Sequence, residues 1–384
     1  MTKPSTITFN ELSGVRAIAA YMVYFHHFLP PFAFLPFLLP IIKEFHTGVT
    51  VFFVLSGFLI CLKYYEKVSF DKYFLFDYFK NRFARIYPIY FLAILLTFLF
   101  ATLPAPDFPF LIKVRNFFLE ATFLRGFFDE FKFLGVGQGW TLTVEETFYF
   151  LFPFMVFFIK KSRLSFVLLG IYLIGFFLFT IGAAIEFHSF FYPERFIILY
   201  TFFGRAAEFI IGMFLALILL KRDTILPKNG IPWTTLIGII GCLGGLFIMS
   251  RYQSPEVAYG VFTWQGMFLN NIILPIFIAT LFFGLITEET IFRKVLGSRL
   301  FVLLGKASYA FYLFHIGPLR SLFIDKITNH WALAFLLTIL CSIAIYYFIE
   351  EPSRHKIRNI HFDALLQIFR RNFIRGSKPK EVTE

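Results

Sequence analysis

The chain has 384 residues, of which 58% are hydrophobic and only 16% charged, and its mean hydropathy is +0.73. Because soluble domains carry about 25% charged residues, this composition excludes an ordinary soluble enzyme. The net charge of +12 would indicate a nucleic-acid partner in a soluble protein, but here the basic residues lie between apolar segments. Cys61, Cys242 and Cys341 are widely spaced and lie in such segments, which argues against a disulfide framework or a zinc site.

Ten apolar segments are long enough to span a bilayer, which requires roughly 20 apolar residues. We therefore predict an all-α polytopic membrane protein, with a transmembrane domain at 1–350 and a basic tail at 351–384. No cleavable signal precedes the first segment. The predicted spans are 12–30, 47–64, 84–103, 144–160, 164–185, 203–220, 232–250, 268–287, 300–320 and 331–349.

The distribution of Lys and Arg predicts the orientation of these spans. Basic residues are concentrated in alternate connections and in the tail, and such segments usually face the cytoplasm. An even number of spans then places both termini in the cytoplasm and the long loop 104–143 outside, packed over the outer face. The stretch 360–375 is weakly amphipathic, so we expect it to lie on the inner leaflet; a disordered tail is the alternative.

The first span carries Arg16 and the pair His26–His27. Arg16 and His27 are eleven residues apart, so they share one helix face about 16 Å apart along the axis. Ionisable residues inside a membrane are costly and are functional candidates. The alternative is that either histidine only hydrogen bonds a neighbouring helix, which we favour for His26.

Arg82 and Arg85 lie one turn apart at the start of the third span, a spacing that suits phosphate binding. The alternative is that they only reflect the excess of basic residues on the cytoplasmic side. At the start of the fourth span, Glu145 follows Trp140 and is a candidate for orienting a histidine. Its alternative role is a carboxylate that interacts with the helix dipole.

The ninth span contains Tyr309, Tyr312 and His315. Interfacial aromatic residues with a hydrogen-bonded histidine are the alternative interpretation. Glu350 and Arg354 follow the tenth span as a further acid and base, and a salt-bridged helix end is the alternative interpretation. On the predicted topology, His27, Glu145 and His315 lie toward the outer half. The residues expected at the inner face are Arg16, Arg82, Arg85 and Arg354. No residue spacing indicates a metal site.

At these residues the sequence resembles the acyltransferase-3 family of membrane-bound acyltransferases. The resemblance runs in family order from residue 12 to residue 354, and it departs at Ser13 and Thr141, neither of which is a proposed catalytic group. The motifs are Arg16 with His27, Ser56-Gly57-Phe58, Arg82-x-x-Arg85, Trp140-Thr-Leu-x-x-Glu145, Ser308-Tyr309-x-x-Tyr312-Leu-x-His315, and Glu350-x-Pro352-x-Arg354.

The resemblance implies O-acylation, commonly acetylation, of a cell-surface glycan or lipid-linked saccharide. Its donor would be cytoplasmic acyl-CoA, used as a co-substrate rather than a bound cofactor. The protein would span a cell membrane, which the resemblance indicates is a bacterial inner membrane. Its partners would include membrane lipids but no nucleic acid. Arg16, Arg82 and Arg85 would hold the phosphates of coenzyme A.

We expect His27 to act as the general base on the acceptor hydroxyl, with Glu145 orienting it. His315, Tyr309 or Tyr312 would donate a hydrogen bond to the oxyanion. A covalent intermediate on a histidine or on Ser56 is a less favoured route. A transporter that uses the intramembrane residues as a substrate or proton path is the alternative function, but no inverted repeat supports it.

Overall fold

The computed structural model describes residues 9–29, 36–106, 108–222, 227–328 and 330–362. Within these ranges the regular structure is helical, and the only β pairings are two isolated bridges. The α-helices of this part of the chain are α1 Asn10–His27, α2 Leu39–Lys43, α3 Gly48–Tyr64, α4 Lys72–Thr97, α5 Phe110–Ala121, α6 Trp140–Ile159, α7 Leu164–Ile185, α8 Glu194–Tyr200, α9 Phe202–Leu220, α10 Trp233–Ser250, α11 Trp264–Phe268, α12 Leu274–Thr287, α13 Ile291–Leu296, α14 Arg299–Phe314, α15 Pro318–Lys326, α16 Trp331–Ile345 and α17 Glu351–Arg358.

Every predicted span overlaps a helix of the structure, but the number of candidate spans differs from the expected ten. In the described ranges, eight helices are long and apolar enough to cross a membrane, or nine if the bent pair α14–α15 counts as one span. Helix α1 is not among them, since it carries Glu11, Arg16 and two histidines. The helices support a multi-pass membrane protein, while ten crossings and cytoplasmic termini stay predictions.

The ninth predicted span, 300–320, is broken rather than continuous. Helices α14 and α15 meet at 90°. Gly317 adopts a φ of 107°, a conformation that glycine tolerates because it lacks a Cβ, and Pro318 begins α15, where its missing N–H has no cost. The break places His315 at the C-terminal cap of α14.

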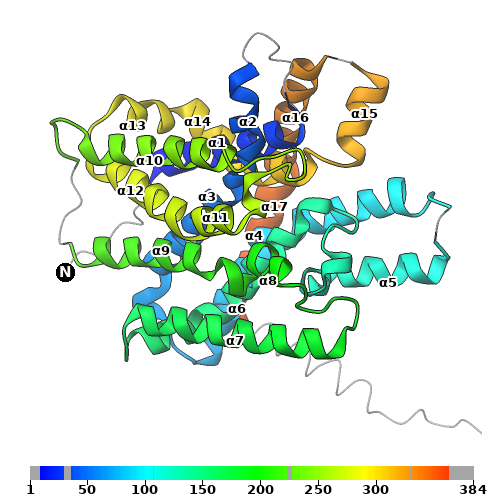
Figure 1. Cartoon of the computed structure of the whole chain (residues 1–384), viewed down its shortest axis with the longest axis horizontal. Coiled ribbons are helices and arrows are strands. Elements are labelled where there is room, and N and C mark those ends of the chain that lie inside the picture. The colour runs from blue at the N-terminus through cyan, green and yellow to red at the C-terminus, as the bar shows by residue number, and fades with distance from the viewer. Residues whose placement is uncertain (1–8, 30–35, 107, 223–226, 329, 363–384) are drawn as a thin grey trace, which may run out of the picture.

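Close helix contacts bring the polar residues of the interior together. A Cβ on Gly57 of α3 would lie 2.1 Å from the carbonyl oxygen of Phe209 in α9, and one on Gly212 would lie 2.0 Å from that of Val54. Small residues of this kind let membrane helices approach closely. In Figure 1, α3 and α4 run through the middle of the bundle and α7 lies along its lower edge.

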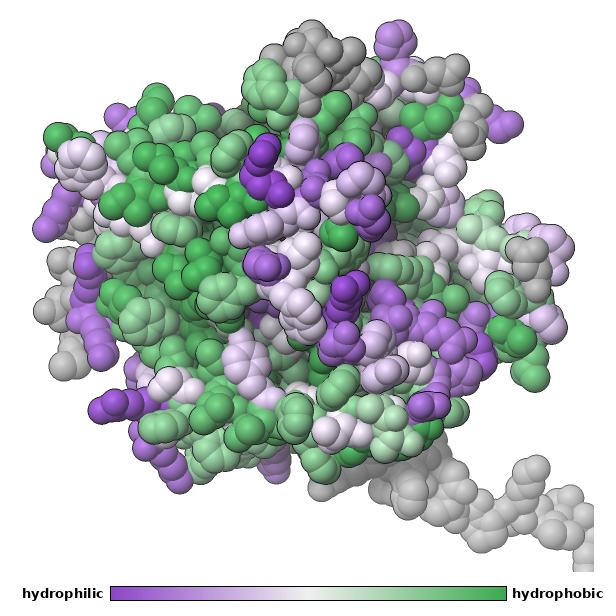
Figure 2. Space-filling model, viewed as in Figure 1, coloured by the Kyte–Doolittle hydropathy of each residue, from purple (hydrophilic) through white to green (hydrophobic). Residues whose placement is uncertain are grey.

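The surface of the bundle is largely apolar. Helix α7 exposes large side chains such as Phe166, Leu173 and Phe177. Figure 2 shows apolar side chains over much of one face, with hydrophilic ones gathered at its left rim and through its centre and right. Apolar surface of this extent is expected where helices face lipid tails rather than water.

The described part of the segment 104–143 packs against the helices, and its location on the outer side of the membrane stays a prediction. The side chain of Gln138 donates a hydrogen bond to the carbonyl oxygen of Leu313 over 2.6 Å, and the hydroxyl of Tyr90 donates to the carbonyl oxygen of Glu120 over 3.0 Å. Fully buried Arg125 donates to the carbonyl oxygen of Val136 over 2.6 Å. These bonds fix the start of α6.

The predicted boundary at residue 350 lies inside a continuous helix. Helix α16 passes through a π-helical turn, Tyr346–Glu350, into α17. Helix α17 is attached to α4, since Arg358 Nε donates to Asn81 Oδ1 over 2.9 Å. Most of the predicted amphipathic stretch 360–375 lies outside the described residues.

Candidate active site: two cavities that share a wall

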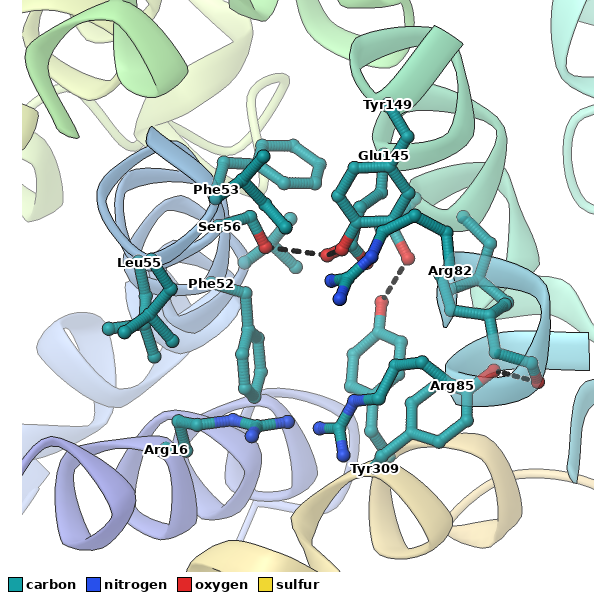
Figure 3. A pocket seen from close by; sticks show the side chains of 17 residues that line it. Arg16, Phe52, Phe53, Leu55, Ser56, Arg82, Arg85, Glu145, Tyr149 and Tyr309 are labelled. Carbon is teal, nitrogen blue, oxygen red and sulfur yellow. Dashed lines mark hydrogen bonds between the residues drawn. The ribbon is translucent and has the colours of Figure 1, made fainter. Parts of the chain in front are cut away.

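A small cavity of about 120 Å³ lies between α1, α3, α4, α6 and α14 (Figure 3). We call it the arginine cavity, because three of its lining residues are the predicted phosphate-binding arginines. Its polar lining consists of Arg16, Ser56, Arg82, Arg85, Thr141, Glu145, Tyr149, Tyr309 and Tyr312. The structure thus brings the three arginines of two separate sequence motifs to one place.

The guanidinium groups of these three arginines form few hydrogen bonds or ion pairs with the described residues. Arg16 forms no hydrogen bond with any described residue, and Figure 3 shows its guanidinium pointing toward that of Arg85. The Nε of Arg82 is buried without a hydrogen-bond partner, while its guanidinium lies 5.5 Å from the ring centroid of Tyr149. Only Arg85 is paired, at 3.2 Å from Glu350. Such unsatisfied cations can bind an anion.

Glu145 lies in the arginine cavity and not beside His27. Its Oε1 accepts a hydrogen bond from Ser56 Oγ over 2.5 Å and another from the hydroxyl of Tyr149. The predicted Glu145–His27 contact is therefore absent from the described structure. Helix geometry explains the error, since Glu145 is about 140° around α6 and about 7.5 Å along it from Trp140, which lines a different cavity.

A second cavity, of about 400 Å³, lies next to the first, and we call it the histidine cavity. Its walls come from α1, the α2–α3 junction, the start of α6, α9 and the segment around Tyr259. Aromatic side chains make up much of the wall. The lining includes His26, His27, His46, Phe133, Gln138, Trp140, Tyr200, Arg205, Tyr259, Phe262 and Tyr312.

His27 and His315, which the sequence placed only in the same half of the bundle, lie together. Their ring centroids are 5.4 Å apart. His27 is exposed and its side chain forms no hydrogen bond with the described residues, so it can meet a ligand. His315 is fully buried, and its Nδ1 lies 2.7 Å from the carbonyl oxygen of Tyr312. A carbonyl only accepts, so Nδ1 carries the proton and the unpartnered Nε2 is left as an acceptor.

The two cavities share Val49 and Tyr312 as lining residues. The hydroxyl of Tyr312 lies 2.9 Å from Thr141 Oγ1 and 3.3 Å from the carbonyl oxygen of Gln138. Phe52 packs edge-on against the Tyr312 ring, with centroids 5.7 Å apart. A partition that includes Val49 and Tyr312 therefore separates Arg16, Arg82 and Arg85 on one side from the imidazoles on the other.

Of the remaining predicted site residues, some line one of the cavities and others do not. The hydroxyl of Tyr309 donates to the carbonyl oxygen of Ile86 over 2.8 Å, so its proton is already engaged. Trp140 lines the histidine cavity and packs edge-on against Tyr200 at 4.8 Å. Arg354 pairs with Glu351 and lines neither cavity, whereas Glu350 pairs with Arg85.

Sequence reasoning missed a carboxylate–histidine pair. Glu44 Oε2 lies 3.0 Å from His46 Nε2, and His46 faces the histidine cavity. Both residues precede α3 in a short polar interruption of an apolar stretch, a signal too weak to indicate function. In the part of the chain that the structure describes, no three His, Cys, Asp or Glu residues are arranged to hold a metal ion.

Comparison with known proteins gives a family match over most of the chain. The acyltransferase-3 family model, described as an acyltransferase domain, matches residues 9–347. O-acetyltransferase OatA of Staphylococcus aureus, in strains NCTC 8325 and MRSA252, is 26% identical over 373 residues. A second protein of S. aureus strain COL, SACOL0978, which is named as a candidate O-acetyltransferase, is 25% identical over 377 residues.

These alignments cover 89–90% of this chain but only 57% of each relative. The chain therefore spans little more than half the length of the curated relatives that it matches. The comparison with solved structures finds no significant match.

Proposed function

The chain belongs to the acyltransferase-3 family, and from this premise we propose that it is a membrane-bound O-acyltransferase. It moves an acyl group, most simply acetyl, from acyl-CoA to a hydroxyl of a cell-surface glycan or lipid-linked saccharide. The observation that carries this proposal is the pair of adjoining cavities, one with cations and the other with imidazoles, that meet at Val49 and Tyr312.

The donor binds in the arginine cavity. The Nε of Arg82 is buried without a hydrogen-bond partner, and the guanidinium of Arg16 points toward that of Arg85; phosphates are strong acceptors for such groups. A volume of about 120 Å³ equals that of about four liquid water molecules, so it holds the thioester end rather than the whole coenzyme. The phosphates lie at its arginine-lined mouth.

The acceptor binds in the histidine cavity, which at about 400 Å³ is large enough for a sugar ring. Flat aromatic side chains contact the ring face, while Gln138, Arg205 and the histidines offer hydrogen-bond partners to its hydroxyls. Binding sites commonly combine an apolar wall with a few placed polar groups. The names of the relatives as O-acetyltransferases support a hydroxyl acceptor.

In the transfer step, neutral His27 removes the proton of the acceptor hydroxyl. The oxygen attacks the thioester carbonyl, the carbon–sulfur bond breaks, and the thiolate leaves toward the arginine cavity. The hydroxyl of Tyr312 lies in the partition and donates to the oxyanion when it turns from its present partner. His315 supports His27 through its free Nε2, and Glu145 acts on the donor side.

The orientation of the helices in the membrane follows from the side on which the acyl-CoA donor is found. Arg16 and the RxxR arginines face the cytoplasm, where acyl-CoA is made available, and α1 crosses the membrane of the cell although it is less apolar than the other spans. This gives ten crossings and cytoplasmic termini. The positive charge of the connections at 160–163 and 221–228, both expected in the cytoplasm, supports that orientation.

The test uses vesicles that contain the full chain and acetyl-CoA labelled in the acetyl group. We expect base-labile label in the membrane saccharide fraction and release of free CoA. Arg16→Ala is expected to weaken donor binding at least tenfold, and His27→Ala to abolish transfer while CoA still binds. Full transfer by a normally inserted His27→Ala protein would overturn the mechanism, and transport of label without acyl transfer would favour a transporter.

A further inference from the structure

His46 differs from the other imidazoles of the histidine cavity because it has a carboxylate partner. Its Nε2 lies 3.0 Å from Oε2 of Glu44, whose side chain is completely buried. By contrast, His26 Nδ1 lies 2.6 Å from the carbonyl oxygen of Lys43, and His315 Nδ1 also faces a carbonyl. A carbonyl cannot neutralise a protonated imidazole, whereas a carboxylate can.

Glu44 is held in place by bonds that leave one of its oxygens for His46. The backbone N–H of Gly260 donates to Oε1 over 2.7 Å, and the side chain of Gln253 donates to the same oxygen. Oε2 is left to accept the Nε2–H of His46, which fixes the tautomer and leaves the lone pair on Nδ1. A carboxylate that orients an imidazole and stabilises its protonated form is the arrangement found in catalytic triads.

The rings form a continuous series from the acceptor site to this pair. The centroid of His27 lies 4.8 Å from that of His26, which in turn lies 5.4 Å from that of His46. His26 accepts at Nε2, because Nδ1 is bound to Lys43. The ring of Tyr259 packs against His26 at 4.9 Å and against His46 at 6.5 Å, so it covers the series.

We propose that Glu44 and His46 are a positioning pair that holds the proton released from the acceptor hydroxyl. This inference rests on the proposed function. The acceptor O–H bond breaks as His27 takes the proton. The proton then moves to Nε2 of His26 and from that same nitrogen to Nδ1 of His46, while the Nδ1–H of His26 stays on the Lys43 carbonyl. Glu44 balances the charge on His46. The acceptor oxygen forms its bond to the acyl carbon, and the sulfur leaves with the electron pair of the carbon–sulfur bond. The sulfur regains a proton when the histidines discharge, so no net proton is consumed.

The surroundings of His46 make Glu44 the one effective counter-charge among the described lining residues. The titratable or charged groups that face it are Glu44, His26, His27, Tyr259 and Arg205. Arg205 is paired with Glu208, since its Nε–H lies 2.9 Å from each carboxylate oxygen. Neither Arg205 nor the other imidazoles can stabilise an additional positive charge.

The experiment measures transfer from labelled acetyl-CoA to the saccharides of vesicles that contain the full chain, from neutral to alkaline pH. His46→Gln keeps a donor for Glu44 but cannot take up a proton, and Glu44→Gln removes the counter-charge. We expect each to lower the saturated rate about a hundredfold with the half-saturating donor concentration within about twofold. The loss shrinks as pH rises, because a more deprotonated acceptor depends less on a base.

Gln253→Ala is the matched control, since it removes one bond to Glu44 and leaves the pair intact. It is expected to reduce thermal stability as much as Glu44→Gln does, but to keep a rate within about threefold of wild type. A His46→Gln protein with the wild-type rate, or a loss equal to that of Gln253→Ala, would overturn the inference. If the wild-type chain binds CoA but transfers nothing, the proposed function fails instead.

Discussion

Ser56 Oγ donates a hydrogen bond to Glu145 Oε1 over 2.5 Å, which places this carboxylate on the donor side of the partition. The contact joins α3 to α6 through residues that are far apart in the sequence. It separates the roles of two groups that the sequence would assign to one catalytic pair. Glu145 and His27 should therefore have effects on different substrates.

Exchange of Glu145 should alter donor binding, whereas exchange of His27 should not. Glu145→Gln removes a negative charge beside Arg82 and weakens the bonds from Ser56 and Tyr149, so we expect CoA affinity to change by about three- to tenfold. His27→Ala should leave CoA affinity within about twofold. Equilibrium binding of CoA to purified protein checks this, and equal shifts in the two variants would contradict the partition.

Loss of the Tyr312 hydroxyl should slow transfer without weakening either substrate. Tyr312→Phe keeps the ring that separates the cavities but removes the hydroxyl that faces Thr141. We expect the single-turnover rate to fall about tenfold to a hundredfold at unchanged CoA affinity. Thr141→Val, which removes the partner hydroxyl and leaves that of Tyr312, serves as the control. A Tyr312→Phe protein with the wild-type single-turnover rate would show that Tyr312 only separates the two cavities.

The close contact between α3 and α9 should not tolerate a methyl group. At Gly212 a Cβ would lie 2.0 Å from the carbonyl oxygen of Val54, so Gly212→Ala forces the helices apart. We expect a loss of about 1–3 kcal/mol in stability. Gly244→Ala in α10 is the control, because no atom lies within 4 Å of its Cβ position. Thermal unfolding in detergent compares the two, and equal melting temperatures would contradict the packing.

The buried pair of Arg205 and Glu208 should behave as a coupled unit. Both side chains are at most 5% exposed, and Arg205 also donates to Thr50 Oγ1 over 3.0 Å. Either Arg205→Met or Glu208→Gln leaves a buried group without its partner, at a cost of about 3–5 kcal/mol. We expect the loss of unfolding free energy in the double variant to be clearly smaller than the sum of the losses in the two single variants. Additive losses in chemical unfolding would show that the pair is not coupled.

The Glu288 carboxylate at the start of α10 should stabilise the protein at neutral pH and lose this effect as the pH falls. Burial alone raises the pKa of this carboxyl, but hydrogen bonds from Thr235 and Thr234 outweigh it and lower the pKa below its usual value. A lowered pKa in the folded state stabilises the protein above the unfolded pKa and is lost as pH falls. Glu288→Gln should cost about 1 kcal/mol at neutral pH and little in acid. Unfolding at both pH values is the measurement, and a pH-independent difference would exclude the linkage.

Local patterns allowed the prediction of the helices and of most site residues. Arg16, Arg82 and Arg85 do lie together, and His27 does lie beside His315. The predicted topology placed these arginines toward one end of the spans and both histidines toward the other, so this grouping was accessible from the sequence. The partner of each charged group was not, because Ser56 and Glu145 meet only through the packing of two helices.

The sequence by itself determined that this is a helical membrane protein with arginines and histidines in its interior, because composition and apolar segment length are local properties. Only the tertiary structure decided that α14 breaks at Gly317, that Glu145 faces the arginines, and that Glu44 rather than Glu145 pairs with a histidine. These facts depend on distances between helices, which close glycine contacts and the bend set. No pattern along a single helix encodes such distances.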